Sequence, residues 1–161
     1  MAVQDEQFNK CLIAAIRILT GRDYSCAELI RKLSHQGFPS ESIRRVINEC
    51  QRQNYLDDAR YARSYTHKLH NKGYGGRRIQ QMLVAKGLDR KVIDDSLSDY
   101  FEERIQIQSC RQAMLKKIKN MRGNESIEKA RAKIYRFLYQ RGFSSAVILK
   151  TMDEDVASFL S

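Results

Sequence analysis

Three glycines divide the sequence into units that share one apolar pattern. Aligned on Gly37, Gly87 and Gly142, the chain repeats a large apolar residue at four further columns. These columns lie eight and four residues before each glycine and one and six residues after it, and they hold Leu29, Ile79 and Ile134; Leu33, Leu83 and Leu138; Phe38, Leu88 and Phe143; and Ile43, Ile93 and Ile148. Glycine often ends a helix because it adopts the left-handed backbone of the stop. The alignment therefore predicts three copies of one helical unit.

Each unit carries local signals for three amphipathic helices. In the first unit an apolar stripe over residues 8–19 ends at Gly21, and Ser25 with Glu28 forms a capping box for the next helix. Ser40 is expected to cap the third helix. The expected capping residues of the later units are Asp57, Asp89 and either Ser144 or Ser145. One long helix over about residues 99–120 is expected to open the third unit.

A unit of about 50 residues is too small to bury its own apolar stripes, so neighbouring units must stack. The predicted fold class is therefore all-α, with three tandem three-helix repeats forming an elongated, curved helical-repeat protein. The predicted repeats span residues 1–53, 54–98 and 99–161. A body of this kind suits an extended partner better than a small molecule.

The charge distribution indicates which units meet that partner. The 161 residues include 29 Lys and Arg against 19 Asp and Glu, a formal net charge of +10. Residues 59–91 hold nine basic residues and one acid, and residues 104–136 hold ten and two, whereas residues 1–53 hold eight and six. Such a balance is typical of proteins that bind nucleic acid or another acidic surface. We therefore expect the binding face on the second and third units, with the first as a weaker contact.

Other classes of function are disfavoured by what the sequence lacks. The four cysteines, which form no CxxC pair, are typical of thiols in a reducing compartment. No signal-peptide core or apolar run of roughly 18 residues occurs, so a cytoplasmic protein without membrane contact is expected. His67 and His70 have no further ligands nearby, so neither a metal nor a cofactor is expected. No nucleophile, base and orienting group occur together, and we predict that the chain is not an enzyme.

The second unit holds the strongest candidate contacts. Arg60, Arg63, His67 and His70 follow at i, i+3, i+7 and i+10, a spacing that places them on one helical face. A solvated face is the simpler interpretation. However, solvated faces normally alternate charges to gain i, i+4 pairs, and the uninterrupted sign here favours a phosphate or carboxylate contact.

The segment over residues 72–78, Lys-Gly-Tyr-Gly-Gly-Arg-Arg, is the most distinctive of the chain. A helix stop followed by a turn accounts for its three glycines. Glycines also let a backbone approach a partner closely, and a helix N-terminus beside Arg77 and Arg78 favours an anion. Tyr74 has two alternatives, stacking on a base or packing on a neighbouring side chain.

The sequence from Tyr55 to Gly87 closely resembles the signature of the RecX family of bacterial recombinase regulators. The resemblance is strongest over residues 55–62, 72–79 and 83–87. It implies a protein that binds the RecA nucleoprotein filament in its helical groove and restrains RecA in recombination, DNA repair and the SOS response. Filament growth, strand exchange, ATP hydrolysis and co-protease function are the activities that family members lower. The resemblance also implies weaker binding to single- and double-stranded DNA.

The family's basic positions match at Lys72, Arg78 and Lys86. Met82 stands where members usually have Glu, and Leu69 stands where they often have a basic residue. The candidate filament- and DNA-binding residues are Arg60, Arg63, Lys68, Lys72, Tyr74, Arg77, Arg78, Lys86, Lys116, Lys117, Lys119, Arg131 and Lys133. A monomer is expected. Two alternatives stay open, a helix-turn-helix DNA-binding regulator and a repeat adaptor for an acidic protein.

Overall fold

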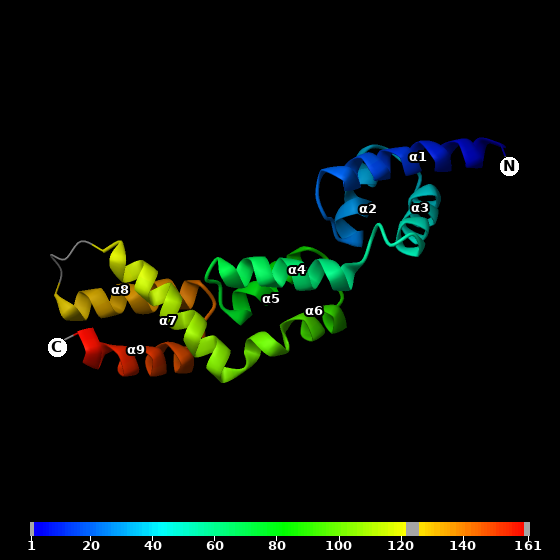
Figure 1. Ribbon diagram of the computed structural model, residues 1–161. Coiled ribbons are helices and arrows are strands. Elements are labelled where there is room, and N and C mark those ends of the chain that lie inside the picture. Colours follow the sequence, from blue (N-terminus) through cyan, green and yellow to red (C-terminus); the bar gives the residue numbers. More distant parts are fainter. Residues whose placement is uncertain (1, 122–125, 160–161) are drawn as a thin grey trace. The chain divides into compact units, whose positions relative to one another are not determined.

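The computed structural model describes residues 2–121 and 126–159 (Figure 1). Over these ranges it contains nine α-helices, one short 3-10 turn and no strand, which confirms the predicted all-α class. The helices are α1 Ala2–Gly21, α2 Cys26–His35, α3 Ser40–Arg52, α4 Asp58–Asn71, α5 Gly76–Ala85, α6 Arg90–Leu97, α7 Glu103–Lys119, α8 Ile127–Gln140 and α9 Ser145–Phe159. None of these described helices is long and apolar enough to cross a membrane.

The glycine alignment marks equivalent helix ends. Gly37, Gly87 and Gly142 all have positive φ, at 82°, 74° and 92°, and each stands two residues after the last residue of a helix. The residue after the first and third glycines donates its N–H to the carbonyl five residues earlier, as in the bond from Phe143 to Leu138 at 3.3 Å. Every apolar column residue is buried except Phe38, which is half-buried. The repeat therefore builds the same helix stop and the same core positions three times.

The chain forms two compact units, which we describe separately. Unit 1 comprises Met1–Ser64 with Leu83–Ile93, and unit 2 comprises Tyr65–Met82 with Asp94–Ser161. Helices α4, α5 and α6 each contribute residues to both units. The predicted repeat boundaries after residues 53 and 98 stay predictions.

In unit 1, helices α1, α2 and α3 enclose an apolar core. The buried members of this core are Cys11, Ala15, Leu29, Leu33, Ile43, Val46, Ile47, Cys50 and Leu56. The predicted capping box is confirmed, because Glu28 N–H donates to Ser25 Oγ at 3.1 Å and Ser25 N–H donates to the Glu28 carboxylate at 3.2 Å. The prediction that Ser40 caps α3 is wrong. Pro39 occupies the cap with an extended backbone, and Ser40 is already the first helical residue.

In unit 2, helices α7, α8 and α9 enclose a second core. Its buried members are Cys110, Ala113, Met114, Ile134, Leu138, Phe143, Ile148 and Met152. The single long helix expected over residues 99–120 is interrupted, because Glu102 has an extended ψ of 130° between a 3-10 turn at Asp99–Phe101 and the start of α7. Ser144 caps α9 by accepting the N–H of Val147 at 3.3 Å. The cysteines in the described ranges form no disulfide.

Candidate nucleic-acid interface

The exposed side of α4 carries most of its predicted contacts. Arg60, Arg63 and Lys68 are all exposed. Arg60 is held at the start of the helix, because its N–H donates to Asp57 Oδ1 at 2.9 Å and its guanidinium donates to the Asn54 carbonyl at 3.1 Å. The predicted cap by Asp57 is therefore confirmed. Because the three basic side chains are exposed, they are accessible to an anionic partner.

The predicted face of α4 is not exposed along its whole length. Seven residues of α-helix turn through roughly 700°, so His70 lies only about 20° from Arg63 around the helix axis, on the predicted side. Its ring is half-buried in unit 2, with Nε2 2.6 Å from Ser109 Oγ and an edge-to-face contact with Tyr100 at 4.8 Å. Burial lowers the pKa of His70 below its ordinary value. His70 therefore does not extend the cationic face.

The glycine-rich turn between α4 and α5 has a structural role within unit 2. Gly75 N–H donates to the Arg141 carbonyl at 2.8 Å. A Cβ on Gly75 would lie 2.6 Å from the Gly142 carbonyl carbon, and a Cβ on Gly142 would lie 2.4 Å from the backbone nitrogen of Arg78. The start of α5 thus packs directly on the end of α8. This close approach explains Gly75 and Gly142 without a ligand.

Around this contact, cationic side chains lie over aromatic rings. The Arg77 guanidinium lies 5.1 Å from the Tyr139 ring centroid and donates to the Phe143 carbonyl at 2.8 Å. The Arg141 guanidinium lies 4.7 Å from the Tyr74 ring and donates to the Lys72 carbonyl at 2.7 Å. Cation–π contacts of this kind fix the orientation of both partners. Tyr74 therefore packs on a neighbouring side chain, the Arg141 guanidinium, while its stacking on a base stays a prediction.

Sequence reasoning missed three members of this cluster, Phe137, Tyr139 and Arg141. Arg141 also lies 5.0 Å from the Phe137 ring, and Lys117 Nζ lies 5.3 Å from the same ring. One feature of the sequence could have indicated this aromatic cluster. Tyr135 and Tyr139 are four residues apart on α8 and lie outside its buried stripe of Ile134 and Leu138. The spacing places both tyrosines on one side of the helix.

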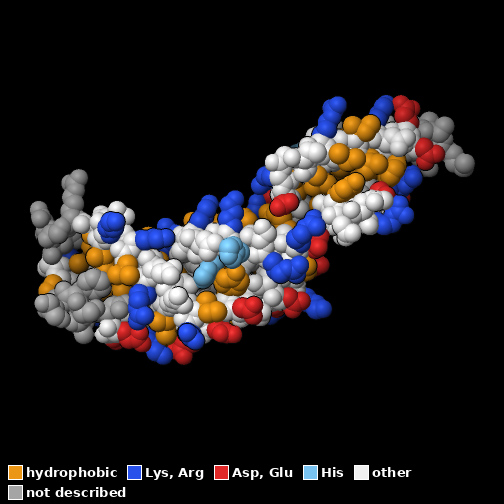
Figure 2. All heavy atoms as spheres, in the orientation of Figure 1, with side chains coloured by type: hydrophobic (Ala, Val, Ile, Leu, Met, Phe, Trp, Pro, Cys, Tyr) orange, Lys and Arg blue, Asp and Glu red, His pale blue; other side chains and the backbone are white. Residues whose placement is uncertain are grey.

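The basic residues predicted for the third repeat lie on α7 and α8. Lys116, Lys119 and Lys133 are exposed, whereas Lys117 is half-buried. Arg131 lies 3.5 Å from Asp153, an exposed pair that contributes little stability. The three lysines in the last turn of α7 also favour its C-terminal dipole. Figure 2 shows Lys and Arg side chains spread over the helices of unit 2. Arg122 and Glu125 of the basic stretch lie outside the described residues.

Lys86 differs from the other candidates because it is engaged inside unit 1. Its Nζ lies 2.6 Å from Glu28 Oε1, and the two side chains are only 23% and 10% exposed. Glu28 also accepts a hydrogen bond from the Tyr61 hydroxyl at 3.1 Å. Although burial favours the neutral acid, hydrogen bonds from Lys86 and from the Ser25 backbone hold the pKa of Glu28 below its ordinary value. The Lys86 ammonium is therefore engaged within unit 1, unlike the exposed cations of α4.

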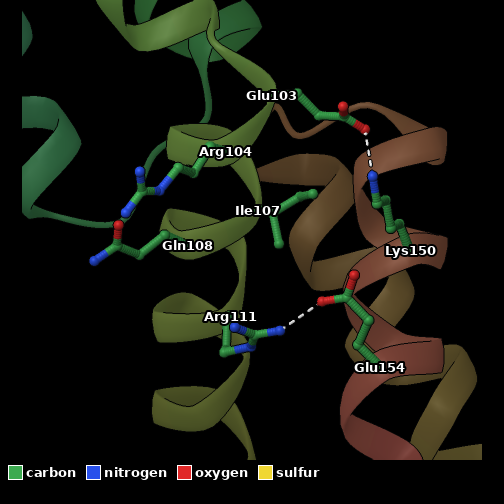
Figure 3. A pocket seen from close by; sticks show the side chains of 7 residues that line it. All are labelled: Glu103, Arg104, Ile107, Gln108, Arg111, Lys150 and Glu154. Carbon is green, nitrogen blue, oxygen red and sulfur yellow. Dashed lines mark hydrogen bonds and ion pairs between the residues drawn. The ribbon is translucent and has the colours of Figure 1, made fainter.

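A separate open pocket of about 570 Å³ lies between α7 and α9 in unit 2 (Figure 3). Two ion pairs cross it, one from Lys150 to Glu103 at 2.8 Å and one from Arg111 to Glu154 at 2.6 Å. Each of these cations already faces a carboxylate, so the pocket does not attract an anion strongly. The two ion pairs join α7 to α9. No cluster of three metal-ligating side chains occurs in the described ranges.

The fold and this surface define a class of protein: an all-α chain of tandem three-helix domains with cations and aromatic rings exposed on its helices. Models of the first, second and third three-helix domains of RecX match residues 11–50, 57–97 and 105–152. The chain belongs to the RecX family.

Individual relatives agree with this assignment. The chain is 38% identical over 145 residues to the regulatory protein RecX of Vibrio campbellii, covering 88% of this chain and 91% of that protein. It is 34% identical over 151 residues to the regulatory protein RecX of Legionella pneumophila, covering 94% and 98%. A crystal structure of regulatory protein RecX matches with a TM-score of 0.81 and 26% identity, covering 94% of this chain and 74% of that one. RecX from Lactobacillus salivarius shares the fold, also with a TM-score of 0.81. The chain is thus a member of a family of regulatory proteins.

Proposed function

We propose that this protein binds the RecA–DNA filament and restrains RecA, lowering filament growth, strand exchange, ATP hydrolysis and co-protease function. The observation that carries the proposal is the match to all three RecX domains in one chain. The exposed cations of α4, α5, α7 and α8 supply the physical basis. A nucleoprotein filament is long and polyanionic, and cations spread over several helices suit such a partner better than one recognition helix does.

The proposed contact surface comprises the candidate cations other than Lys86, whose ammonium is paired with Glu28 inside unit 1. Its members are Arg60, Arg63, Lys68, Lys72, Arg77, Arg78, Lys116, Lys117, Lys119, Arg131 and Lys133. By bridging neighbouring RecA subunits and the DNA between them, these residues would oppose the rearrangement that accompanies ATP hydrolysis. The protein would work in the cytoplasm as a monomer.

The test compares affinity for RecA-coated single strands, bare single strands and duplex at one salt concentration, together with RecA ATP hydrolysis. Preference for the coated strands with loss of hydrolysis supports the proposal. Tight sequence-dependent duplex binding with unchanged hydrolysis would instead support a helix-turn-helix regulator, which reads base edges through one helix. Binding to RecA without DNA, at equal strength, would support the adaptor alternative.

A charge-reversal pair links the result to the surface. Arg63→Glu with Arg78→Glu changes two exposed residues of α4 and α5 and leaves the hydrogen bond from Arg77 to the Phe143 carbonyl intact. The matched control is Arg17→Glu with Arg31→Glu, two exposed arginines of unit 1. We expect the first pair to weaken inhibition of ATP hydrolysis about tenfold or more and the control pair to leave it within about twofold. Equal effects of the two pairs would remove α4 and α5 from the surface.

A further inference from the structure

Three neighbouring side chains of unit 2 carry planar groups, and we call them the tyrosine ladder: Arg77, Tyr139 and Tyr135. The rings of Tyr135 and Tyr139 have centroids 6.2 Å apart and planes only 11° from parallel. The Arg77 guanidinium lies 5.1 Å from the centroid of Tyr139. The ladder therefore combines residues from the start of α5 and the outer side of α8.

Both ends of the ladder are held in place by hydrogen bonds. Arg77 donates to the Phe143 carbonyl at 2.8 Å, and the Tyr135 hydroxyl bonds to Ser145 Oγ at 2.9 Å. The Arg77 guanidinium and the Tyr135 ring are thus held on either side of the contacts that they make with Tyr139. A ligand that stacks on the ladder does not have to immobilise these side chains, which favours binding.

The packing of the core does not account for Tyr139. Helix α8 is already anchored by Ile134 and Leu138, which are buried in the unit 2 core, while Tyr139 is 50% exposed. An exposed aromatic ring beside fixed cations is a common feature of surfaces that bind single strands.

The charges around the ladder suit a polyanion. Helix α8 carries four basic residues and one acid, Glu128. Lys72 is tied to the end of α8 through the bond from Arg141 to its carbonyl, and the backbone of Arg78 packs against Gly142. The backbones of Lys72 and Arg78 therefore lie at the end of α8, and the Arg77 guanidinium lies over Tyr139 itself. Cations and aromatic rings on one surface can contact the phosphates and the bases of one strand together.

From this geometry we propose that the tyrosine ladder stacks on unpaired nucleobases, so that the protein holds single-stranded DNA by base faces as well as by phosphates. The inference deepens the proposed function and rests on it in taking DNA as the polyanion. Bases inside a duplex already have both faces stacked on their neighbours. The ladder therefore adds affinity for single strands and none for duplex interiors.

The test measures binding of a fluorescent thymidine oligonucleotide and of an abasic oligonucleotide with the same number of phosphates. Tyr139→Ala should weaken binding of the thymidine strand by about 5- to 140-fold, the range for losing one stacked base, and leave the abasic strand unchanged. Tyr139→Phe keeps the ring and should restore binding. Tyr55→Ala, at a tyrosine of unit 1 that is 58% exposed, is the matched control and should leave both strands unchanged.

Equal weakening of both oligonucleotides, or no effect of Tyr139→Ala on the thymidine strand, would overturn the inference. RecA ATP hydrolysis is measured with the same variants to separate the two proposals. If Tyr139→Ala lowers inhibition but not thymidine binding, the ladder contacts RecA, which refutes base stacking and supports the proposed function. If the unaltered protein distinguishes thymidine from abasic strands through Tyr139 but never inhibits hydrolysis, base stacking stands and the proposed function fails.

Discussion

Lys86 Nζ lies 2.6 Å from Glu28 Oε1, joining the end of α5 to the first turn of α2 across 58 residues of sequence. Both side chains are largely buried in unit 1, so each charge depends on the other for solvation. The same carboxylate closes the capping box with Ser25. The Glu28 carboxylate therefore stabilises the start of α2 and also links the first repeat to the second.

Lys86→Met should destabilise the protein by about 2 kcal/mol, since it leaves a buried carboxylate without its closest cation. The expected loss is below that of an isolated buried charge because Tyr61 and the Ser25 backbone still bond to Glu28. Urea unfolding measures the free energy of unfolding. Lys10→Met, which removes an exposed pair with Glu6, is the control and should cost no more than about 0.5 kcal/mol. Similar losses in the two variants would show that burial of the Glu28 pair is unimportant.

Acid should unfold the protein partly through Glu28. Its pKa is lowered in the folded state, so the unfolded chain takes up the proton first as pH falls. The stability from this group is complete above the ordinary glutamate pKa of about 4.3 and is lost as pH drops through the lower folded value. Between pH 5 and 3 the free energy of unfolding should therefore fall less steeply in Glu28→Gln than in the unaltered protein. The difference between the two slopes corresponds to at most about one proton taken up on unfolding. Identical slopes would mean that Glu28 has its ordinary pKa.

Gly142→Ala and Gly37→Ala separate backbone strain from close packing. Both glycines have positive φ, but a Cβ at Gly37 meets open space while one at Gly142 meets the backbone of Arg78. Gly37→Ala should cost about 1 kcal/mol from the backbone alone. Gly142→Ala should cost about 2 to 4 kcal/mol, because the start of α5 must also move. Thermal and urea unfolding give both values, and a Gly142 cost no larger than the Gly37 cost would contradict the packing of α5 on α8.

The helix ends and the core columns were predictable because their causes are local. A glycine followed by a large apolar residue can be recognised from a few residues of sequence. At Gly142 and Phe143 the glycine does have positive φ and the phenylalanine is buried. Ser25 and Glu28 were likewise recognisable from their spacing of three. The prediction that Ser40 caps α3 was wrong because Pro39, the residue before it, takes the cap position.

The candidate site was less predictable because its contacts join distant residues. Nothing in the sequence near Lys86 indicates that Glu28 lies beside it, and nothing near Tyr74 indicates Arg141. His70 lies on the predicted side of α4, but nothing near it in the sequence indicates that Ser109 and Tyr100 would cover its ring. Charge composition located the basic repeats, but only packing separates the cations that face outward from those used inside.

Binding to duplex DNA should weaken steeply with salt. If about six phosphates are neutralised, the slope of log affinity against log salt concentration is roughly −5. Arg78→Gln removes one exposed cation whose only described polar side-chain contact is Gln81 at 3.3 Å, and it should reduce the steepness by about 0.9. Arg17→Gln, at an exposed arginine of α1, should leave the slope unchanged. Anisotropy titrations between 50 and about 200 mM salt give both slopes. If Arg17→Gln reduced the slope as much as Arg78→Gln, the first repeat would be an equal contact with DNA, because the slope counts phosphates neutralised wherever they lie.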